Sequence, residues 1–346
     1  MSLSERLPRL WYGPRWRTLL LWPLAGAYAF AVAFRGLLYR TGWLASHRVA
    51  VPVVVVGNLT VGGTGKTPVA AWLARQLSLR GRRVGVVLRG YGGRAVPAPV
   101  VVGPDADPRQ VGDEAVLHSL RRPHVVVVHP DRVAAARRAA EEGAEIVVCD
   151  DGLQHLRLAR DYEIVVVDGA RGFGNGLLLP AGPLRESARR LERVDAVCVT
   201  DRGAGRASPL HVQGPRLLTA AFRLGEAVNL RSGERRPLKS FRGRVTHAVA
   251  GIGNPDAFFD GLRAAGLEPV AHALPDHAAL DPAALPFPAG ATVLMTEKDA
   301  VKCRDAAGPD WWFVELDVAV EREAARELLA HVLERTGLTG AGVHLG

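Results

Sequence analysis

An apolar run leads directly into a glycine-rich loop and then a predicted helix, and this order limits the folds that the chain can adopt. Residues 51–56 read Val-Pro-Val-Val-Val-Val, a β-branched pattern typical of a strand that is covered on both faces. Residues 57–65 are rich in glycine, and a helix is predicted over 66–80. A strand buried on both faces belongs inside a parallel sheet with helices on either side, so we expect an α/β fold.

The glycine-rich loop matches, with one departure, the phosphate-binding pattern G-x-x-x-x-G-K-[ST], known as the P-loop. Its residues are Thr60, Val61, Gly62, Gly63, Thr64, Gly65, Lys66 and Thr67, so threonine stands where the pattern begins with glycine. Backbone N–H groups of such a loop surround phosphates, while Lys66 would reach the β- and γ-phosphates and the Thr67 hydroxyl would bind Mg²⁺. We therefore predict ATP and Mg²⁺ as cofactors.

A second apolar run, residues 146–149, ends in the acidic pair Asp150 and Asp151. Two adjacent acids could form a simple turn. Behind a P-loop, however, an aspartate at the end of a strand faces the loop and holds Mg²⁺, directly or through water. We predict a metal site of Thr67, Asp150 and Asp151, with Asp151 also among the catalytic residues, and leave open which acid binds the ion directly.

Two further acidic motifs are weak signals on their own. Gly112-Asp113-Glu114 places acids where the first turn of a helix favours them through its dipole. Asp276 and His277 form an acid–imidazole pair in a loop of the second half.

Four residues are candidates for contact with the substrate. Arg132 and Arg185 could bind phosphate, because a planar guanidinium binds it through two hydrogen bonds. Either could equally be a solvated surface arginine in a chain so rich in this residue. Gln154 and His155 follow the two aspartates and are expected beside the predicted metal site.

Strand–helix alternation continues along the chain. Further strands are predicted over residues 82–88, 125–128, 146–149, 164–167 and 196–199, with a helix over 132–142. A linker is predicted around 201–209, and short strands over 211–242 with a turn at Ser232 and Gly233. A second α/β unit follows, with strands over 245–250 and 292–296 and helices over 255–265 and 320–335.

Positive charge and aromatic residues are concentrated at the N-terminus. The chain has a net charge of +9, and its first fifty residues hold seven arginines against one acid. The uncharged stretch Thr18–Phe34 is short for a span of about 17–25 residues, and Pro23 interrupts it. A helix lying in the membrane interface fits best, because it combines an apolar body, a basic rim and Trp and Tyr side chains. A spanning helix and a helix buried against the protein body are the alternatives.

Nine motifs, taken together, resemble the tetraacyldisaccharide 4′-kinase family, the membrane-associated lipid A kinases of Gram-negative bacteria. They occur in the order GNLTVGGTGKTP (57–68), RGYGG (89–93), GDE (112–114), CDDGLQH (149–155), FGNG (173–176), LPAGPLRE (179–186), GIGNP (251–255), PDH (275–277) and TEKDAVK (296–302). The resemblance covers nearly the whole chain, and its specificity lies in the set of motifs.

The resemblance implies Mg²⁺-dependent, in-line transfer of the γ-phosphate of ATP to the 4′-hydroxyl of a tetraacylated glucosamine disaccharide 1-phosphate in lipopolysaccharide biosynthesis. It matches Asp113 to the catalytic aspartate and His277 to its histidine partner, so that Asp113 assisted by His277 would accept the hydroxyl proton. It places the reaction at the cytoplasmic face of the inner membrane. It leaves the role of the TEKDAVK motif open.

The expected architecture is therefore a P-loop kinase-like parallel sheet with helices on both faces, plus a smaller second α/β domain joined by a short β linker. With 346 residues the chain is long enough for two domains. We expect a membrane-associating segment over 1–48, a nucleotide-binding domain over 49–210, the β linker over 211–242, and a domain closing the active-site cleft over 243–346. The partners expected are the acylated disaccharide, ATP and the inner-membrane surface, without nucleic acid, and we expect a monomer.

Two other functions compete with this one. A membrane-docked P-loop GTPase or a partition-type ATPase would share the phosphate loop. Guanine-binding proteins usually carry Asn-Lys-x-Asp, whereas the nearest segment here is Glu297-Lys298-Asp299, with different spacing. A nucleic-acid-binding protein would account for the basic charge, but that charge lies on a Trp- and Leu-rich segment and no nucleic-acid-binding module is recognisable.

Overall fold

The computed structural model describes residues 10–94, 97–121, 123–201, 214–275, 287–288, 290–303 and 307–339. Its N-terminal segment is helical, with a 3₁₀ helix η1 and an α-helix α2: η1 (Arg15–Leu21) and α2 (Trp22–Arg40). The N-terminal half of the body then contains β1 (Val53–Gly57), α3 (Lys66–Ser78), β2 (Val84–Leu88), β3 (Val100–Val101), α4 (Pro108–Val111), α5 (Asp113–Leu120), β4 (Val125–Val128), α6 (Arg132–Glu141), β5 (Ile146–Asp150), β6 (Tyr162–Asp168), η2 (Ala188–Arg193) and β7 (Ala196–Asp201).

The described part of the C-terminal half contains six strands with helices between them. In order these elements are β8 (Arg216–Asn229), β9 (Arg235–Arg236), η3 (Leu238–Phe241), β10 (Thr246–Ala250), α7 (Pro255–Ala264), β11 (Val270–Ala273), β12 (Thr292–Thr296), α8 (Glu297–Cys303), β13 (Trp311–Val320) and α9 (Arg322–Arg335). The predicted alternation of strands and helices is confirmed in both halves.

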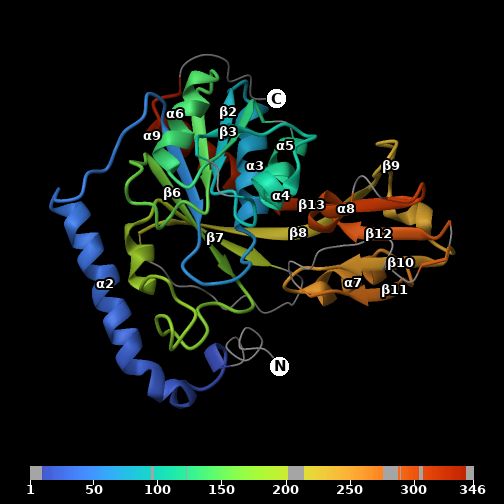
Figure 1. The fold of residues 1–346 in the computed structure, drawn as a ribbon, viewed down its shortest axis with the longest axis horizontal. Helices are drawn as coiled ribbons and strands as arrows, with labels where there is room; N and C mark the ends of the chain where they lie inside the picture. Colours follow the sequence, from blue (N-terminus) through green and yellow to red (C-terminus); the bar gives the residue numbers. More distant parts are fainter. Residues whose placement is uncertain are drawn as a thin grey trace.

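The thirteen strands within the described residues join one sheet, which runs through the whole body (Figure 1). The strand order is β11-β10-β12-β13-β8-β7-β6-β1-β5-β2-β4-β3, with β9 paired to β8. Within each half the strands are mostly parallel, and β8 joins the two halves because it pairs with β7 in parallel and with β13 antiparallel. The α/β fold class is confirmed.

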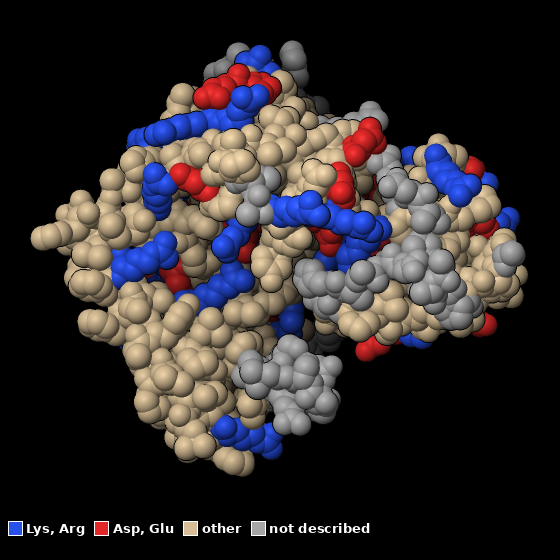
Figure 2. Space-filling model, in the orientation of Figure 1, with Lys and Arg blue, Asp and Glu red and all other residues tan. Residues whose placement is uncertain are grey.

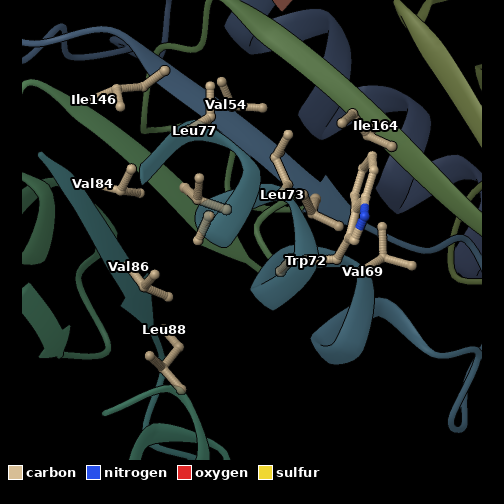
Figure 3. Packing of buried hydrophobic residues seen from close by; sticks show 14 of the residues in the cluster. Val54, Val69, Trp72, Leu73, Leu77, Val84, Val86, Leu88, Ile146 and Ile164 are labelled. Carbon is tan, nitrogen blue, oxygen red and sulfur yellow. The ribbon is translucent and has the colours of Figure 1, made fainter. Parts of the chain in front are cut away.

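Helices cover both faces of the sheet in the N-terminal half because successive side chains of its strands point to opposite faces, and both sets of side chains are apolar. Val54 and Val56 of β1 pack in the core that contains α3, whereas Val53 and Val55 pack in the core that contains α6. Figure 3 shows the first of these cores, where α3 packs on the sheet through Val69, Trp72, Leu73 and Leu77. Burying each such side chain stabilises the fold by about 1.5–3 kcal/mol, which fixes the helix that follows the P-loop.

The region predicted as short linker strands is different in the structure. Residues 216–229 form one long strand, β8, whose first half pairs with β7 in parallel and whose second half pairs with β13 antiparallel. β8 can be this long because it has a partner along its whole length. Beyond the part that pairs with β7, it pairs with β13, a strand that the sequence analysis did not predict. The two halves are therefore joined by a continuous sheet, while most of the predicted linker lies outside the described residues.

The helix α2 lies along the outside of the N-terminal half, apart from the sheet (Figure 1). None of its residues is buried, so the alternative of a helix buried against the protein body is wrong. Its contacts with the body include two hydrogen bonds: Tyr28 Oη donates to the Arg185 carbonyl at 3.1 Å, and Arg35 donates to the Gln154 carbonyl at 3.1 Å. Among the described residues, 15–40 form the one helical segment long and apolar enough to cross a membrane.

Candidate active site

The P-loop connects β1 to α3 and is held by neighbouring segments. The N–H of Val61 donates to the Pro183 carbonyl at 2.8 Å, and the Arg185 N–H donates to the Leu59 carbonyl at 2.7 Å. From the other side, Thr200 Oγ1 donates to the Thr64 carbonyl at 3.0 Å. The LPAGPLRE segment and β7 thus fix the backbone of the loop, as a preformed phosphate site requires.

Gly65 has a backbone conformation that the loop needs at the start of α3. Its φ is +91°, and a Cβ at this position would lie 2.3 Å from the Phe222 ring of β8. A side chain here therefore has to displace an aromatic ring and also adopt a left-handed conformation.

A Gly65→Ala variant is expected to bind ATP at least about 10-fold more weakly, because the left-handed conformation alone costs about 1–2 kcal/mol. Titration with a fluorescent ATP analogue measures this. Gly103→Ala is the matched control, since a Cβ there would meet nothing within 4 Å. Wild-type ATP affinity in a folded Gly65→Ala protein would show that the loop does not need this conformation.

The acidic end of β5 lies beside the P-loop because β1 and β5 are adjacent parallel strands that end at the same edge of the sheet, with Val56 paired to Asp150. Asp150 is buried, and its Oδ2 lies 3.0 Å from Nε2 of the buried His118. Burial alone would raise the pKa of Asp150, but the hydrogen bond and charge of His118 outweigh it and hold the pKa below its usual range. Asp150 is therefore an ionised carboxylate in the interior.

A magnesium ion fits the residues at this end of β5. The second oxygen of Asp150, Oδ1, is buried and has no hydrogen-bond partner among the described residues, which is costly unless a ligand binds it. The described residues contain no group of three or more His, Cys, Asp or Glu side chains that could hold a metal by themselves. Mg²⁺ takes one or two protein oxygens and completes its shell with phosphate oxygens and water, so the unpaired oxygen of Asp150 is a suitable ligand for it.

Asp151 has a different environment from Asp150. It adopts a left-handed backbone conformation, with φ of 52°, and is partly exposed. Its carboxylate lies 3.8 Å from Lys66 Nζ and 3.2 Å from the guanidinium of Arg185. The structure thus brings together three predicted site residues, with Asp151 between two cations.

The GDE motif reaches the same edge of the sheet. Asp113 is the first residue of α5, and Glu114 Oε1 lies 3.5 Å from Thr67 Oγ1 of the P-loop. Burial, followed by the negative charge of Asp150, raises the pKa of Glu114. Glu114 was not predicted as a site residue. Its place in the same motif as Asp113 was the available signal.

The remaining predicted residues surround this edge. Gln154 donates to the Asn58 carbonyl at 3.1 Å and to Glu186 at 3.0 Å, so it ties the start of the P-loop to the LPAGPLRE segment. Burial and then the charge of Arg132 lower the pKa of His155 to about 4, which leaves its imidazole neutral at physiological pH. Arg132 is buried and donates to the His129 carbonyl at 2.9 Å.

His277 and Asp276 lie outside the described residues. The segment that leads to them is described as far as Pro275. The Leu274 N–H donates to the Ala250 carbonyl at 2.9 Å, so the PDH motif begins next to the end of β10, where the GIGNP motif starts.

The TEKDAVK motif, whose role the sequence left open, connects the two halves. Glu297 at the start of α8 accepts two hydrogen bonds from Arg121, which follows α5, at 2.9 and 2.7 Å. Asp299 is fully buried and accepts from the Gly251 N–H at 2.8 Å and from Thr296 Oγ1 at 2.6 Å. Figure 2 shows Lys and Arg side chains near the centre of this face, at the junction of the halves.

Known proteins are similar to this chain over almost its whole length. The sequence profile of the family described as tetraacyldisaccharide-1-P 4′-kinase, LpxK, matches residues 17–334. A tetraacyldisaccharide 4′-kinase of Pseudomonas paraeruginosa is 49% identical over 319 residues, 92% of this chain and 94% of the relative. One of Thiobacillus denitrificans is 49% identical over 318 residues, 91% of this chain and 95% of the relative.

One solved structure is similar to the whole fold. It is the crystal structure of LpxK from Aquifex aeolicus, an "apo" form in complex with ATP. The TM-score is 0.80 at 28% sequence identity, and the match covers 92% of this chain and 99% of that chain.

Proposed function

The chain belongs to the tetraacyldisaccharide-1-P 4′-kinase family, and from this premise we propose how its residues carry out the reaction. It is an ATP-dependent lipid A 4′-kinase that uses ATP and Mg²⁺. The proposed mechanism rests on the meeting of three separate segments of the chain at one edge of the sheet. These are the P-loop after β1, Asp150 at the end of β5 and Asp113 at the start of α5.

We propose that the P-loop binds the triphosphate directly and that the acidic end of β5 binds it through Mg²⁺. The backbone of residues 60–65 and the N-terminus of α3 bind phosphate oxygens, and Lys66 neutralises charge on the phosphate that is transferred. Thr67 Oγ1 and Asp150 Oδ1 would hold Mg²⁺, with Glu114 beside Thr67 as a further candidate. The ion, when bound, neutralises charge that develops on the phosphate oxygens.

Asp151, Arg185, Gln154 and His155 are proposed to line the substrate side of this edge. In the structure Asp151 holds Lys66 and Arg185 through its carboxylate. A phosphate group can replace Asp151 as the partner of Arg185, because guanidinium binds carboxylate and phosphate in the same geometry. Arg132 is proposed to support His155 rather than to touch phosphate, since it is buried and its described hydrogen bond goes to a main-chain carbonyl.

We propose Asp113 as the base that accepts the proton of the 4′-hydroxyl, assisted by His277. A sugar hydroxyl is a very weak acid, and phosphoryl transfer depends mainly on positioning and on charge neutralisation. Asp113 is partly exposed at the tip of α5, one residue before Glu114, and so lies beside the phosphate site. Retained turnover in an Asp113→Ala variant would refute this role. We also propose that the protein acts as a monomer.

The N-terminal helices are proposed to lie on the cytoplasmic face of the inner membrane. Large apolar side chains are exposed along them, among them Trp16, Leu19, Leu20, Trp22, Leu24, Phe30, Phe34 and Leu37. Exposing such a continuous apolar surface to water is unfavourable, whereas an interfacial helix buries it among lipid chains. In Figure 2 the flank formed by α2 carries few charged side chains. The bonds of Tyr28 and Arg35 to loops of the site hold this surface beside the catalytic edge.

A Leu20→Gln, Phe30→Gln, Phe34→Gln triple variant should bind vesicles containing anionic lipids at least about 10-fold more weakly, because each buried apolar side chain contributes about 1.5–3 kcal/mol. Vesicle flotation measures binding, and ATP affinity should stay unchanged. The matched control is Leu79→Gln with Val245→Gln, which alters exposed apolar residues on the body. Equal vesicle binding by the triple variant and the control would contradict the proposed membrane surface.

The GTPase alternative is disfavoured by what the EKD segment does. A guanine-binding aspartate has to be free to accept from the base, but Asp299 is buried, its Oδ2 accepts from the Gly251 N–H and Thr296 Oγ1, and its Oδ1 lies 3.6 Å from Lys302 Nζ. Glu297 is likewise paired with Arg121. The segment serves the packing of the two halves, which supports ATP rather than GTP as the nucleotide.

A further inference from the structure

Lys302, the last residue of the TEKDAVK motif, lies between two carboxylates from different halves of the molecule. Its Nζ is 4.0 Å from Asp113 Oδ2 at the start of α5 and 3.6 Å from Asp299 Oδ1 within its own helix. The lysine side chain is only 10% exposed, and that of Asp113 is 22% exposed. A cation is therefore held, largely out of water, next to the proposed base.

Asp299 is fixed more firmly than an ordinary ion-pair partner. Its Oδ2 accepts from the Gly251 N–H and from Thr296 Oγ1, so the remaining oxygen, Oδ1, is turned toward Lys302. A Cβ at residue 251 would lie 2.8 Å from that Oδ1, so glycine is needed there to leave room for the carboxylate. The start of the GIGNP motif and the TEKDAVK motif thus form one support for the lysine.

A second contact fixes α5 against α8 from the far end. Arg121, directly after α5, binds Glu297 through two hydrogen bonds, while Lys302 reaches Asp113 at the first residue of α5. The helix that carries the proposed base is therefore held at both ends by one motif of the C-terminal half. Neither contact involves a residue of the P-loop or one of the proposed Mg²⁺ ligands.

We propose that Lys302 is a positioning residue that holds the Asp113 carboxylate in the orientation needed to accept the 4′-hydroxyl proton. This rests on the role proposed above for Asp113. The ammonium faces one carboxylate oxygen, Oδ2, and leaves Oδ1 for the hydroxyl. Because an aspartate side chain turns freely unless it is held, and because small displacements of a reacting group cost much of the rate, this support contributes to kcat rather than to ATP binding.

The test is a double-mutant cycle on the full-length enzyme, with transfer of ³²P from ATP to the acylated disaccharide as the readout. Lys302→Met should lower kcat about 10- to 100-fold, with the KM for ATP nearly unchanged, and Lys302→Arg should recover most of the loss. In an Asp113→Ala background, Lys302→Met should lower the remaining rate by less than about 2-fold, because coupled residues are not additive. Lys239→Met, at an exposed position, is the control.

Two results would overturn the proposal: wild-type kcat in Lys302→Met, or an equal loss from Lys302→Met with and without Asp113. If Lys302→Met does not fold, Lys302→Met with Asp299→Asn removes the buried carboxylate that would be left unpaired, and the same loss of kcat is expected. Wild-type kcat in Asp113→Ala would instead refute the role of Asp113. A loss in Asp113→Ala with none in Lys302→Met refutes the role of Lys302 alone.

Discussion

An Asp113→Ala variant should bind ATP as tightly as the wild type and transfer its γ-phosphate about 10³-fold more slowly, in the range by which a positioned general base accelerates a reaction. The carboxylate stands at the first residue of α5, with Glu114 next to it bonded to Thr67. Removing it leaves the P-loop and Asp150 in place, so the nucleotide site is preserved. The loss should therefore fall on kcat and not on the affinity for ATP.

The matched control for Asp113 is Asp256→Ala. Asp256 is an exposed acid in the first turn of α7, so both substitutions remove an acid from the start of a helix and cost a similar interaction with its dipole. Steady-state kinetics with saturating lipid, together with ATP titration, measure both effects. Equal turnover in the two folded variants would mean that Asp113 serves the helix and not the reaction.

A Lys66→Ala variant should lose phosphotransfer by about 10³-fold, at the upper end of what removal of one preorganised charged donor costs. Lys66 is the first residue of α3, its side chain is mostly buried, and its Nζ lies 3.8 Å from Asp151. The variant should still fold, because Asp151 keeps Arg185 as a partner at 3.2 Å. The effect therefore reports on the triphosphate rather than on stability.

The control for Lys66 is Lys239→Ala, which removes an exposed lysine from the C-terminal half. Turnover of ³²P-labelled ATP and thermal unfolding are measured for both. A Lys66→Ala protein with wild-type turnover and a wild-type melting temperature would contradict the assignment of the loop as the phosphate site. Loss of turnover with an unchanged melting temperature is the result expected.

The local elements were predictable because their signals are contiguous in the sequence. The strand Thr292–Thr296 was predicted with its observed bounds, and the helix Pro255–Ala264 to within one residue. The approach of the P-loop to Asp150 was also predictable, since neighbouring parallel strands end at the same edge of a sheet and bring the loops that follow them together.

Contacts between distant segments could not be predicted in this way. The two halves share one sheet because β8 pairs with β7 along its first part and with β13 along the rest, and no local pattern in residues 216–229 indicates either partner. His118 next to Asp150, and Lys302 next to Asp113, are likewise set by the packing of α5 against β4 and α8, which brings its side chains to the end of β5. The sequence left three environments open for the apolar N-terminal stretch, and the exposure of α2 removes one of them.

We propose that this edge of the sheet transfers phosphate from ATP to a lipid hydroxyl. The decisive experiment incubates the enzyme with γ-³²P-labelled ATP and Mg²⁺, with and without the acylated disaccharide 1-phosphate, and separates lipid from free phosphate. We expect label on the lipid, at the 4′-position, and little release of phosphate when the lipid is absent. If the folded enzyme releases labelled phosphate at the same rate with or without the lipid, and labels no lipid, this edge of the sheet is not the site of a lipid kinase.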